Sequence, residues 1–134
     1  MNQNLPVADA RALLARARDA LANAVAPWSG FAVGAALRGA EGAVVTGCNI
    51  ESPTLLQEIC AERVALLKAL SDGHRAFTHI AVVTAKRPAV PPCGLCRQML
   101  MEFAPDLIVI TPNASGEPVQ QPLAALLPDA FLTP

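Results

Sequence analysis

The sequence has no basic run, no apolar stretch long enough to cross a membrane, and no tyrosine. Its ten basic and eleven acidic residues are scattered along 134 positions, for a net charge of -1. Proteins that bind polynucleotides usually carry a basic patch or stripe, so the charge pattern argues against a nucleic-acid partner. Charges or prolines interrupt the apolar stretches well before the ~20 residues that a membrane-spanning helix requires, so we expect no membrane partner.

The first six residues also lack the basic and apolar regions of a secretory signal peptide. We therefore expect a cytoplasmic protein, in which thiols stay reduced and a cysteine cluster indicates metal binding rather than disulfides. Residues 1–134 are enough for one domain with its own core. The composition is 53% hydrophobic. A small domain with so much apolar surface is expected to cover part of it by forming a homo-oligomer, a tetramer or a dimer.

Hydrophobic periodicity divides the chain into helices and strands. Helical spacing predicts helices over residues 7–25, 60–70, 93–103 and 123–127. Apolar runs and turn signals predict strands over residues 31–37, 43–48, 79–84 and 107–111, with room for a fifth strand before the last helix. This order predicts an α/β layered fold whose later strands are parallel and are joined by crossover helices.

Three cysteines have a spacing typical of a metal site. Cys93 and Cys96 form a C-x-x-C pair, and Cys60 opens an earlier predicted helix. A redox pair or two buried thiols would explain the C-x-x-C spacing, but either would leave Cys60 and the nearby Glu62 unexplained. Three thiolates fit a zinc ion and leave a fourth coordination position open for water. The other cysteine and the two histidines have no ligand spacing to this cluster, and we expect structural roles for them: Cys48, His74 and His79.

The charged residues next to these cysteines are candidates for supporting the metal chemistry. Glu62 lies two residues after Cys60, a position that suits a general acid–base beside an open zinc site. Three thiolates leave excess negative charge around a divalent ion. Arg63, or alternatively Arg97, can hydrogen-bond a thiolate and draw off part of that charge, and the sequence favours Arg63.

Several segments resemble the cytidine deaminase family, in the order in which that family carries them. The cysteine and glutamate pattern is the zinc deaminase signature. Residues 27–37 (PWSGFAVGAAL), 47–51 (GCNIE) and 126–131 (LLPDAF) resemble further family motifs. The resemblance covers most of the chain. It implies a single cytidine deaminase-like domain over residues 1–134, a three-layer α/β/α fold with a five-stranded mixed sheet, and one Zn²⁺ per subunit. It also implies a homotetramer, in which Phe131 of a neighbouring subunit would close the pocket.

The resemblance implies roles for individual residues in holding the substrate. Phe31 would pack against the pyrimidine ring, which an aromatic face suits. Asn49 and Glu51 would hydrogen-bond the ribose hydroxyls, although outside this context they are typical of a loop Asn and a solvated Glu. The backbone N–H of Ala61 would hold the base carbonyl, and the backbone carbonyl of Pro91 would accept from the leaving amino group.

Motif and resemblance together predict zinc-dependent hydrolytic deamination of cytidine or deoxycytidine, a reaction of pyrimidine salvage that yields uridine or deoxyuridine and ammonia. Glu62 would carry a water proton to ring N3 and then protonate the departing amine. One segment departs from the family pattern. The family usually continues its Asn-x-Glu with Asn-Ala-Ser-Tyr-Gly, whereas residues 52–56 read Ser-Pro-Thr-Leu-Leu. The family's tyrosine contact to the 5′ end of the sugar therefore has no counterpart, and losing a hydrogen-bond partner can shift specificity strongly.

This departure keeps a second substrate class open: a modified cytosine nucleoside, a nucleoside antibiotic or another aminated heterocycle. Outside enzymes, a structural zinc module or a catalytically inactive binding protein is an alternative. Structural zinc sites usually have four protein ligands, however, and Glu62 would then be idle. A polynucleotide-editing enzyme is a further alternative, which the charge pattern disfavours.

Overall fold

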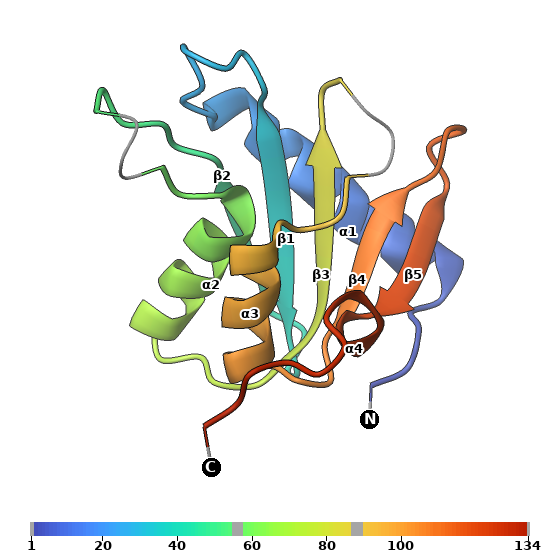
Figure 1. The fold of residues 1–134 in the computed structure, drawn as a ribbon. Coiled ribbons are helices and arrows are strands. Elements are labelled where there is room, and N and C mark those ends of the chain that lie inside the picture. The colour runs from blue at the N-terminus through green and yellow to red at the C-terminus, as the bar shows by residue number, and fades with distance from the viewer. Residues whose placement is uncertain (1, 55–57, 87–89, 134) are drawn as a thin grey trace.

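The computed structural model describes residues 2–54, 58–86 and 90–133 (Figure 1). Its elements are, in chain order, α1 (Val7–Ala20), the 3-10 helix η1 (Leu21–Asn23), β1 (Val33–Gly39), β2 (Val44–Cys48), α2 (Ala61–Ser71), β3 (Phe77–Thr84), α3 (Gly94–Phe103), β4 (Ile108–Pro112), β5 (Pro118–Pro122) and α4 (Leu123–Leu126). Each predicted helix and strand corresponds to one of these elements, and β5 is the fifth strand for which the sequence left room.

The five strands form one sheet in the order β2-β1-β3-β4-β5. β1 pairs antiparallel with β2 and β3, whereas β3 and β4 are parallel and are joined through α3. β5 pairs antiparallel with β4, because the connection of residues 113–117 is too short for the crossover that a parallel pair requires. The mixed sheet is confirmed. The expectation that the later strands are parallel holds for β3 and β4 and is wrong for β5.

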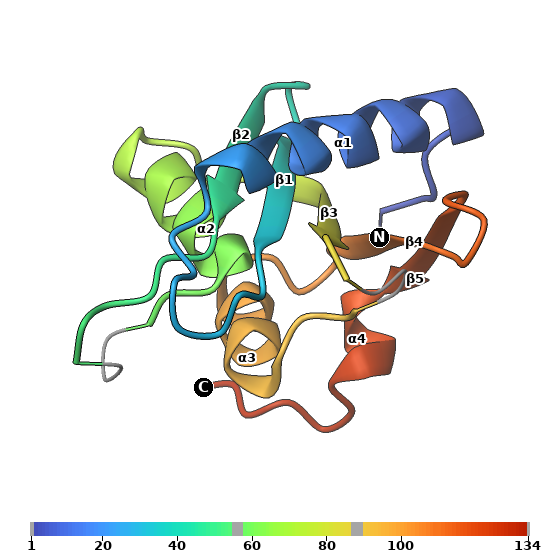
Figure 2. The ribbon, with the colours of Figure 1, turned by 90° about the horizontal axis from the view of Figure 1, so that it is seen from above.

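Helices cover both faces of the sheet (Figure 2). α1 lies on one face, and α2, α3 and α4 lie on the other. Successive residues of β3 alternate between the two sides, as the pleat of a strand requires. Ile80 and Val82 join the core under α2 and α3, while Ala81 and Val83 join the core under α1. The predicted three-layer α/β/α architecture is therefore confirmed.

Two glycines let helices approach the sheet closely. A methyl group on Gly34 of β1 would lie 2.0 Å from the carbonyl oxygen of Ala17 in α1. On the opposite face, a methyl group on Gly47 of β2 would lie 2.5 Å from the Ala61 carbonyl oxygen and 2.6 Å from the Ala65 nitrogen in α2. All three distances are far shorter than a van der Waals contact. The missing side chain at Gly47 therefore determines where the first turn of α2 lies.

α1 ends at Ala20, earlier than its hydrophobic periodicity predicts. The chain tightens into η1, and Ala24 already has extended backbone angles. The next residue, Val25, donates its N–H to the Asn49 carbonyl at 3.0 Å and accepts at its own carbonyl from the Glu51 N–H at 2.7 Å. These two bonds hold the segment before β1 beside the segment after β2.

His79 ties the N-terminal segment to the sheet. Its imidazole is only 3% exposed, and its Nε2 donates to the carbonyl of Gln3 at 2.6 Å. Its Nδ1 lies 2.8 Å from the hydroxyl of Thr78. Burial lowers the pKa of His79, so the neutral imidazole is the form that fits this site.

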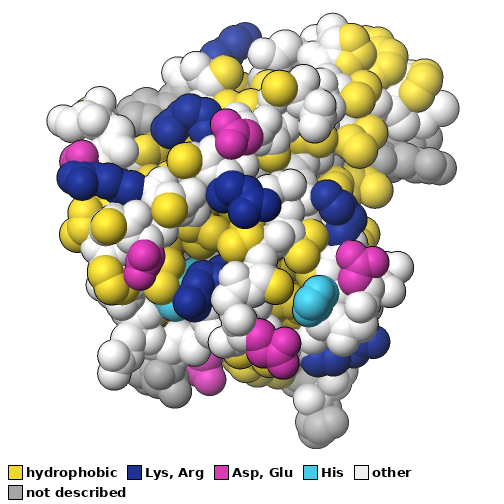
Figure 3. Space-filling model, turned by 180° about the vertical axis from the view of Figure 1, so that it is seen from behind, with side chains coloured by type: hydrophobic (Ala, Val, Ile, Leu, Met, Phe, Trp, Pro, Cys, Tyr) yellow, Lys and Arg dark blue, Asp and Glu magenta, His cyan; other side chains and the backbone are white. Residues whose placement is uncertain are grey.

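The outer face over α1 carries charges of both signs. Figure 3 shows Lys and Arg side chains interspersed with Asp and Glu on this face. Arg11 of α1 and Glu117 form an ion pair of 2.7 Å. Within the described ranges, no helix has both the length and the apolar character needed to span a membrane.

Candidate metal centre and active site

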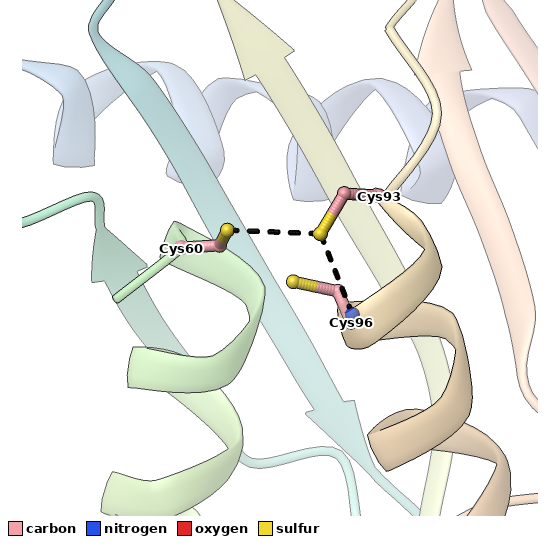
Figure 4. Close-up of side chains that lie close together, drawn as sticks. All are labelled: Cys60, Cys93 and Cys96. Carbon is pink, nitrogen blue, oxygen red and sulfur yellow. Dashed lines mark hydrogen bonds between the residues drawn. The ribbon is translucent and has the colours of Figure 1, made fainter. Parts of the chain in front are cut away.

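The three candidate ligand thiols lie together, although they come from two helices (Figure 4). The Sγ atoms of Cys60, Cys93 and Cys96 all lie within 4.8 Å of one another, and those of Cys60 and Cys93 are 3.8 Å apart. Sulfur ligands ~2.3 Å from a tetrahedral ion lie ~3.8 Å from each other, so the spacing fits zinc. Among the described residues, no fourth His, Cys, Asp or Glu joins the cluster. The cluster therefore suits a metal ion with one coordination position open.

The three cysteines lie at the N-termini of two helices, Cys60 at α2 and the Cys93–Cys96 pair at α3. Cys60 immediately precedes α2 with extended backbone angles of φ -69° and ψ 153°, and Cys93 precedes α3 in the same way. The Cys93 sulfur accepts a hydrogen bond from the backbone N–H of Cys96 at 3.5 Å. The first N–H groups of a helix have no partner within the helix, and its N-terminus carries partial positive charge. Two such ends at one point favour thiolates.

The pKa values of two of the three thiols shift in opposite directions. A hydrogen bond from the Cys96 thiol, together with the nearby Arg63, lowers the pKa of Cys60 to about 5. The pKa of Cys96 rises, because its proton is held by the Cys60 sulfur and because its side chain is fully buried. One thiolate is therefore present at neutral pH before any metal binds. Metal binding releases the remaining thiol protons, since ligating cysteines are deprotonated.

Glu62 lies in the first turn of α2 and is only 4% exposed. Burial raises the pKa of Glu62, and the negative charge of Cys60 raises it further. Glu62, Cys60 and Cys93 line the same cavity. A raised pKa makes a buried carboxylate a stronger base, which suits a group that must accept a proton and then donate it as a general acid–base.

The two candidate arginines have different partners. Arg63 Nη2 lies 3.9 Å from Cys60 Sγ and donates to a backbone carbonyl at 3.1 Å, while its buried Nε has no hydrogen-bond partner within the described part of the chain. Arg97 donates instead to the carbonyls of Pro92 and Leu126, at 2.6 and 2.7 Å. The Arg63 guanidinium thus lies against the thiol cluster, whereas Arg97 links the segment before α3 to α4.

A cavity of about 290 Å³ opens beside the thiols and contains most of the predicted substrate-binding residues. Phe31, Asn49, Glu51 and Pro91 line it. Ala61 is fully buried beside Cys60 and contributes no lining side chain. Its backbone N–H is the first of α2 and, by its place in the helix, has no partner within the helix.

Phe131 does not line the cavity of its own chain. It lies in the C-terminal segment, is 74% exposed, and its carbonyl accepts a hydrogen bond from Gln98 of α3 at 2.6 Å. Four of the six predicted substrate-binding residues therefore line the cavity, Ala61 lies directly after the lining residue Cys60, and Phe131 is on the surface.

Four lining residues had no predicted role: Ser29, Val33, Glu58 and Val90. Ser29 and Val33 belong to the segment of residues 27–37 that resembles a family motif, so that segment was the available signal. Glu58 and Val90 belong to no motif, and their only signal was their place next to predicted site residues, since Glu58 lies two residues before Cys60 and Val90 directly precedes Pro91. Glu58 adds a third carboxylate to the lining, beside Glu51 and Glu62.

Asn49 and Glu51 are bonded to the chain's own backbone. Asn49 accepts from the Val33 N–H at 2.9 Å and donates to the Phe31 carbonyl at 2.8 Å. Glu51 Oε1 accepts from the N–H groups of Trp28 and Ser29 at 3.1 and 3.2 Å, and Oε2 accepts from the Ser29 hydroxyl. That hydroxyl is the main cause that lowers the pKa of Glu51.

The segment that departs from the family pattern is described only in part. Ser52 and Thr54 lie in a turn with their hydroxyl oxygens 3.2 Å apart. Leu55, at the position of the family's tyrosine, and Leu56 lie outside the described residues.

Comparisons with known proteins agree with this site. A sequence model of the cytidine and deoxycytidylate deaminase zinc-binding region matches residues 8–111. The cytidine deaminase of Sporosarcina psychrophila is 42% identical over 124 residues, which cover 92% of this chain and 91% of that protein. The 1.6 Å crystal structure of cytidine deaminase from Burkholderia pseudomallei has a TM-score of 0.84 at 43% identity, covering 90% of this chain and 97% of that one. Blasticidin-S deaminase of Bacillus cereus is 30% identical over 106 residues, which cover 72% of this chain and 74% of that protein.

The fold, the thiol cluster and the matched region define a zinc-dependent hydrolytic deaminase. More specifically, the chain belongs to the cytidine deaminase family.

Proposed function

We propose that this protein hydrolytically deaminates cytidine and deoxycytidine, giving uridine and deoxyuridine with release of ammonia. The observation that carries this proposal is the buried Glu62 carboxyl in the same cavity as Cys60 and Cys93. Relatives named cytidine deaminase, one of them 42% identical over most of the chain, support the substrate.

Cys60, Cys93 and Cys96 are the proposed zinc ligands, with one zinc ion per subunit. Held by these three thiolates, zinc would supply the Lewis acidity that activates a water for attack near neutral pH. Arg63, against the Cys60 sulfur, withdraws part of the negative charge of the three thiolates. A smaller negative charge on the three thiolates would leave a bound zinc ion a stronger Lewis acid.

Glu62 performs the proton transfers. It accepts one proton of the attacking water and passes it to ring N3. It then takes the second proton, from the new hydroxyl on C4, and delivers it to the amino group that leaves. One water is consumed and one ammonia is released, so a single carboxylate returns to its starting state after each turnover. Its raised pKa suits a group that must hold and release the proton in turn.

The remaining roles concern substrate position. Phe31 would pack on the base, and Asn49 and Glu51, which line the same cavity, would hydrogen-bond the sugar hydroxyls. The Ala61 N–H, at the start of α2, would donate to the base carbonyl. The Pro91 carbonyl would accept from the leaving amino group.

Glu62→Gln tests the catalytic role. We expect the variant to fold and to retain zinc, and to lose about a thousandfold or more in kcat, because glutamine cannot transfer protons. Ammonia release from cytidine and zinc content are the measurements, with Glu41→Gln, at an exposed position in the β1–β2 turn, as the matched control. Near-normal turnover in Glu62→Gln would contradict the proton-transfer role. No ammonia release by the zinc-loaded parent protein would contradict the proposed function itself.

A modified cytosine nucleoside is the second candidate substrate class. The similarity to a blasticidin-S deaminase and the unusual residues 52–56 favour it. A panel of cytidine, deoxycytidine, sugar-modified cytosine nucleosides and free cytosine separates the two. A kcat/KM for cytidine that greatly exceeds all the others would exclude this alternative.

We also propose that the protein is a homo-oligomer, with four subunits as the expected number, and that Phe131 closes the cavity of a neighbouring subunit. Large apolar side chains exposed on one chain support this: Trp28, Leu95, Phe131 and Leu132 are all at least half exposed. Sedimentation at assay concentrations tests it, and a fully active monomer would contradict it.

The 134 residues would act as one deaminase domain, a proposal supported by the coverage of 91% of a relative's length. The four free thiols support a reducing cytoplasmic location. The proposed deamination of cytidine there would be a reaction of pyrimidine salvage. Limited proteolysis tests the single domain, and cell fractionation tests the location. A stable proteolytic fragment or a secreted protein would contradict them.

A further inference from the structure

One wall of the cavity is held together through Ser29. This residue lies in the segment before β1 and faces the segment after β2, which carries Glu51. Its hydroxyl donates to Glu51 Oε2 and accepts from the Phe31 N–H at 3.0 Å. Its backbone N–H also donates to Glu51 Oε1 at 3.2 Å. A single side chain thus connects the carboxylate and the aromatic residue on which substrate binding is proposed to depend.

Counting donors and acceptors shows how much of this wall remains free for a ligand. A carboxylate offers about four acceptor positions. The Trp28 N–H and the two Ser29 donors occupy three of those of Glu51. Asn49 uses one amide hydrogen and one lone pair on Phe31 and Val33, so one of each remains. Glu51 therefore has about one acceptor position for a substrate hydroxyl, and the donors on the other three decide where that position points.

We propose that Ser29 is a positioning residue for substrate binding: it holds the last free lone pair of Glu51 and the ring of Phe31 in place on the cavity wall. This inference rests on the proposed deamination of a cytosine nucleoside.

The surroundings of Glu51 explain why a hydroxyl donor is needed at this position. Glu51 is only 7% exposed, and it shares the cavity with the carboxyl groups of Glu58 and Glu62 and with the thiols of Cys60 and Cys93. Burial favours a protonated, neutral carboxyl group, and it acts to raise the pKa of Glu51. A protonated Glu51 would carry a hydrogen where a sugar hydroxyl must donate. The Ser29 hydroxyl counteracts this, and it is the main cause that lowers the pKa of Glu51.

A double-mutant cycle on the zinc-loaded protein tests the proposal. We would measure kcat and KM for cytidine in the parent, Ser29→Ala, Glu51→Gln and the double variant. Ser29→Ala should lower kcat/KM roughly tenfold or more, the size expected for one hydrogen bond to a charged group. The loss should lie mainly in KM, because contacts to the sugar act equally on substrate and transition state. The double variant should lose little more than Glu51→Gln alone, since Ser29 acts through Glu51.

Two further variants separate positioning from general damage. Ser29→Thr keeps the hydroxyl and should restore most of kcat/KM. Ser115→Ala removes a hydroxyl from the β4–β5 turn, whose residues do not line the cavity, and should leave KM unchanged. If Ser29→Ala does not fold, Ser29→Cys takes its place in the cycle, because a thiol is a much weaker donor.

Trp28 provides a readout that needs no catalysis. It is the only tryptophan in the chain, it is 51% exposed, and its backbone N–H donates to Glu51. Ser29→Ala and Glu51→Gln should each increase acrylamide quenching of its fluorescence and lower its anisotropy, and the double variant should change no further. Ser115→Ala should match the parent.

The possible results are distinct. Multiplicative losses in the cycle, or a Ser29→Ala variant whose KM and Trp28 quenching equal those of the parent, would overturn the proposal. If the parent releases no ammonia from cytidine, the proposed function fails, and the fluorescence cycle alone then decides whether Ser29 and Glu51 act as one unit.

Discussion

Replacing Gly47 with alanine tests how closely α2 must approach the sheet for the thiol cluster to form. The added methyl group would lie 2.5 Å from the Ala61 carbonyl oxygen and 2.6 Å from the Ala65 nitrogen. Ordinary contact begins at 3.4 Å, so the first turn of α2 must retreat by about 0.9 Å. Both obstructing atoms belong to the backbone, so no side chain can rotate away to make room.

Two consequences follow from this displacement. Overpacking of this kind costs ~1–3 kcal/mol, and the rigid neighbours place Gly47→Ala toward the upper end. For a domain of this size that corresponds to a fall in Tm of up to about 10 °C. The metal site should suffer as well, because Cys60 directly precedes Ala61, and metal–ligand distances tolerate only ~0.2 Å. We expect zinc affinity to fall by at least about tenfold.

Urea unfolding and zinc competition with a chelator measure the two effects. Gly34→Ala is the matched comparison, because its methyl group would meet the Ala17 carbonyl oxygen of α1 at 2.0 Å, on the opposite face of the sheet. It should destabilise the fold while leaving zinc affinity nearly unchanged. Gly39→Ala, whose methyl group makes only ordinary contacts of 3.5 and 3.7 Å, should change neither. Parent-like stability in Gly47→Ala would refute the packing argument, and parent-like zinc affinity would refute the link from Gly47 to Cys60.

Two further predictions concern Arg63 and His79. Arg63→Gln should weaken zinc binding by roughly ten- to hundredfold, because the guanidinium no longer stabilises the Cys60 thiolate. Arg75→Gln, in the α2–β3 turn, is the control and should leave zinc binding unchanged. Equal zinc affinities of the two variants in chelator competition would contradict this prediction. Burial lowers the pKa of His79, so the unfolded chain binds more protons below pH ~6.5, and the free energy of unfolding should fall as the pH drops from 7 to 5. His79→Gln should flatten that slope and His74→Gln should keep it; identical slopes for the parent and His79→Gln in urea titrations would contradict the argument.

The sequence predicted the helices and four strands because their apolar residues recur with clear periods. β5 was left open for a physical reason. It begins and ends with proline, and Gln120 and Gln121 give it little apolar character. Such a segment forms an edge strand only because a short turn returns it to β4, with Gly116 at a φ of 85°. Nothing local distinguishes it from a loop.

Some residues of the candidate site could likewise be predicted from the sequence, and others could not. The spacing of Cys60, Cys93 and Cys96 indicated a shared site, because ligand chemistry restricts which residues recur at such intervals. The choice between Arg63 and Arg97 was harder, since each follows a ligand position closely. The choice depends on the hydrogen-bond partners of each guanidinium. One partner of Arg97 is the carbonyl of Leu126, which is 29 residues away in the sequence. Ser29 had no signal of its own, because its partner Glu51 is 22 residues distant.

Topology explains why thiols 33 residues apart meet at all. α2 leads into β3, and β3 leads through the following segment into α3, so both helices run opposite to the strand between them (Figure 1). The N-termini of α2 and α3 therefore lie at the same end of the sheet, the end where β3 finishes. β2 and β3 run in the same direction because both are antiparallel to β1, and β3 and β4 are parallel, so α2 and α3 must each return the chain to the start of the next strand. Two such crossovers in succession thus present two positively polarised helix ends to one point. The cysteines occupy those ends, so the thiolate site uses a field that the backbone creates whatever the side chains are.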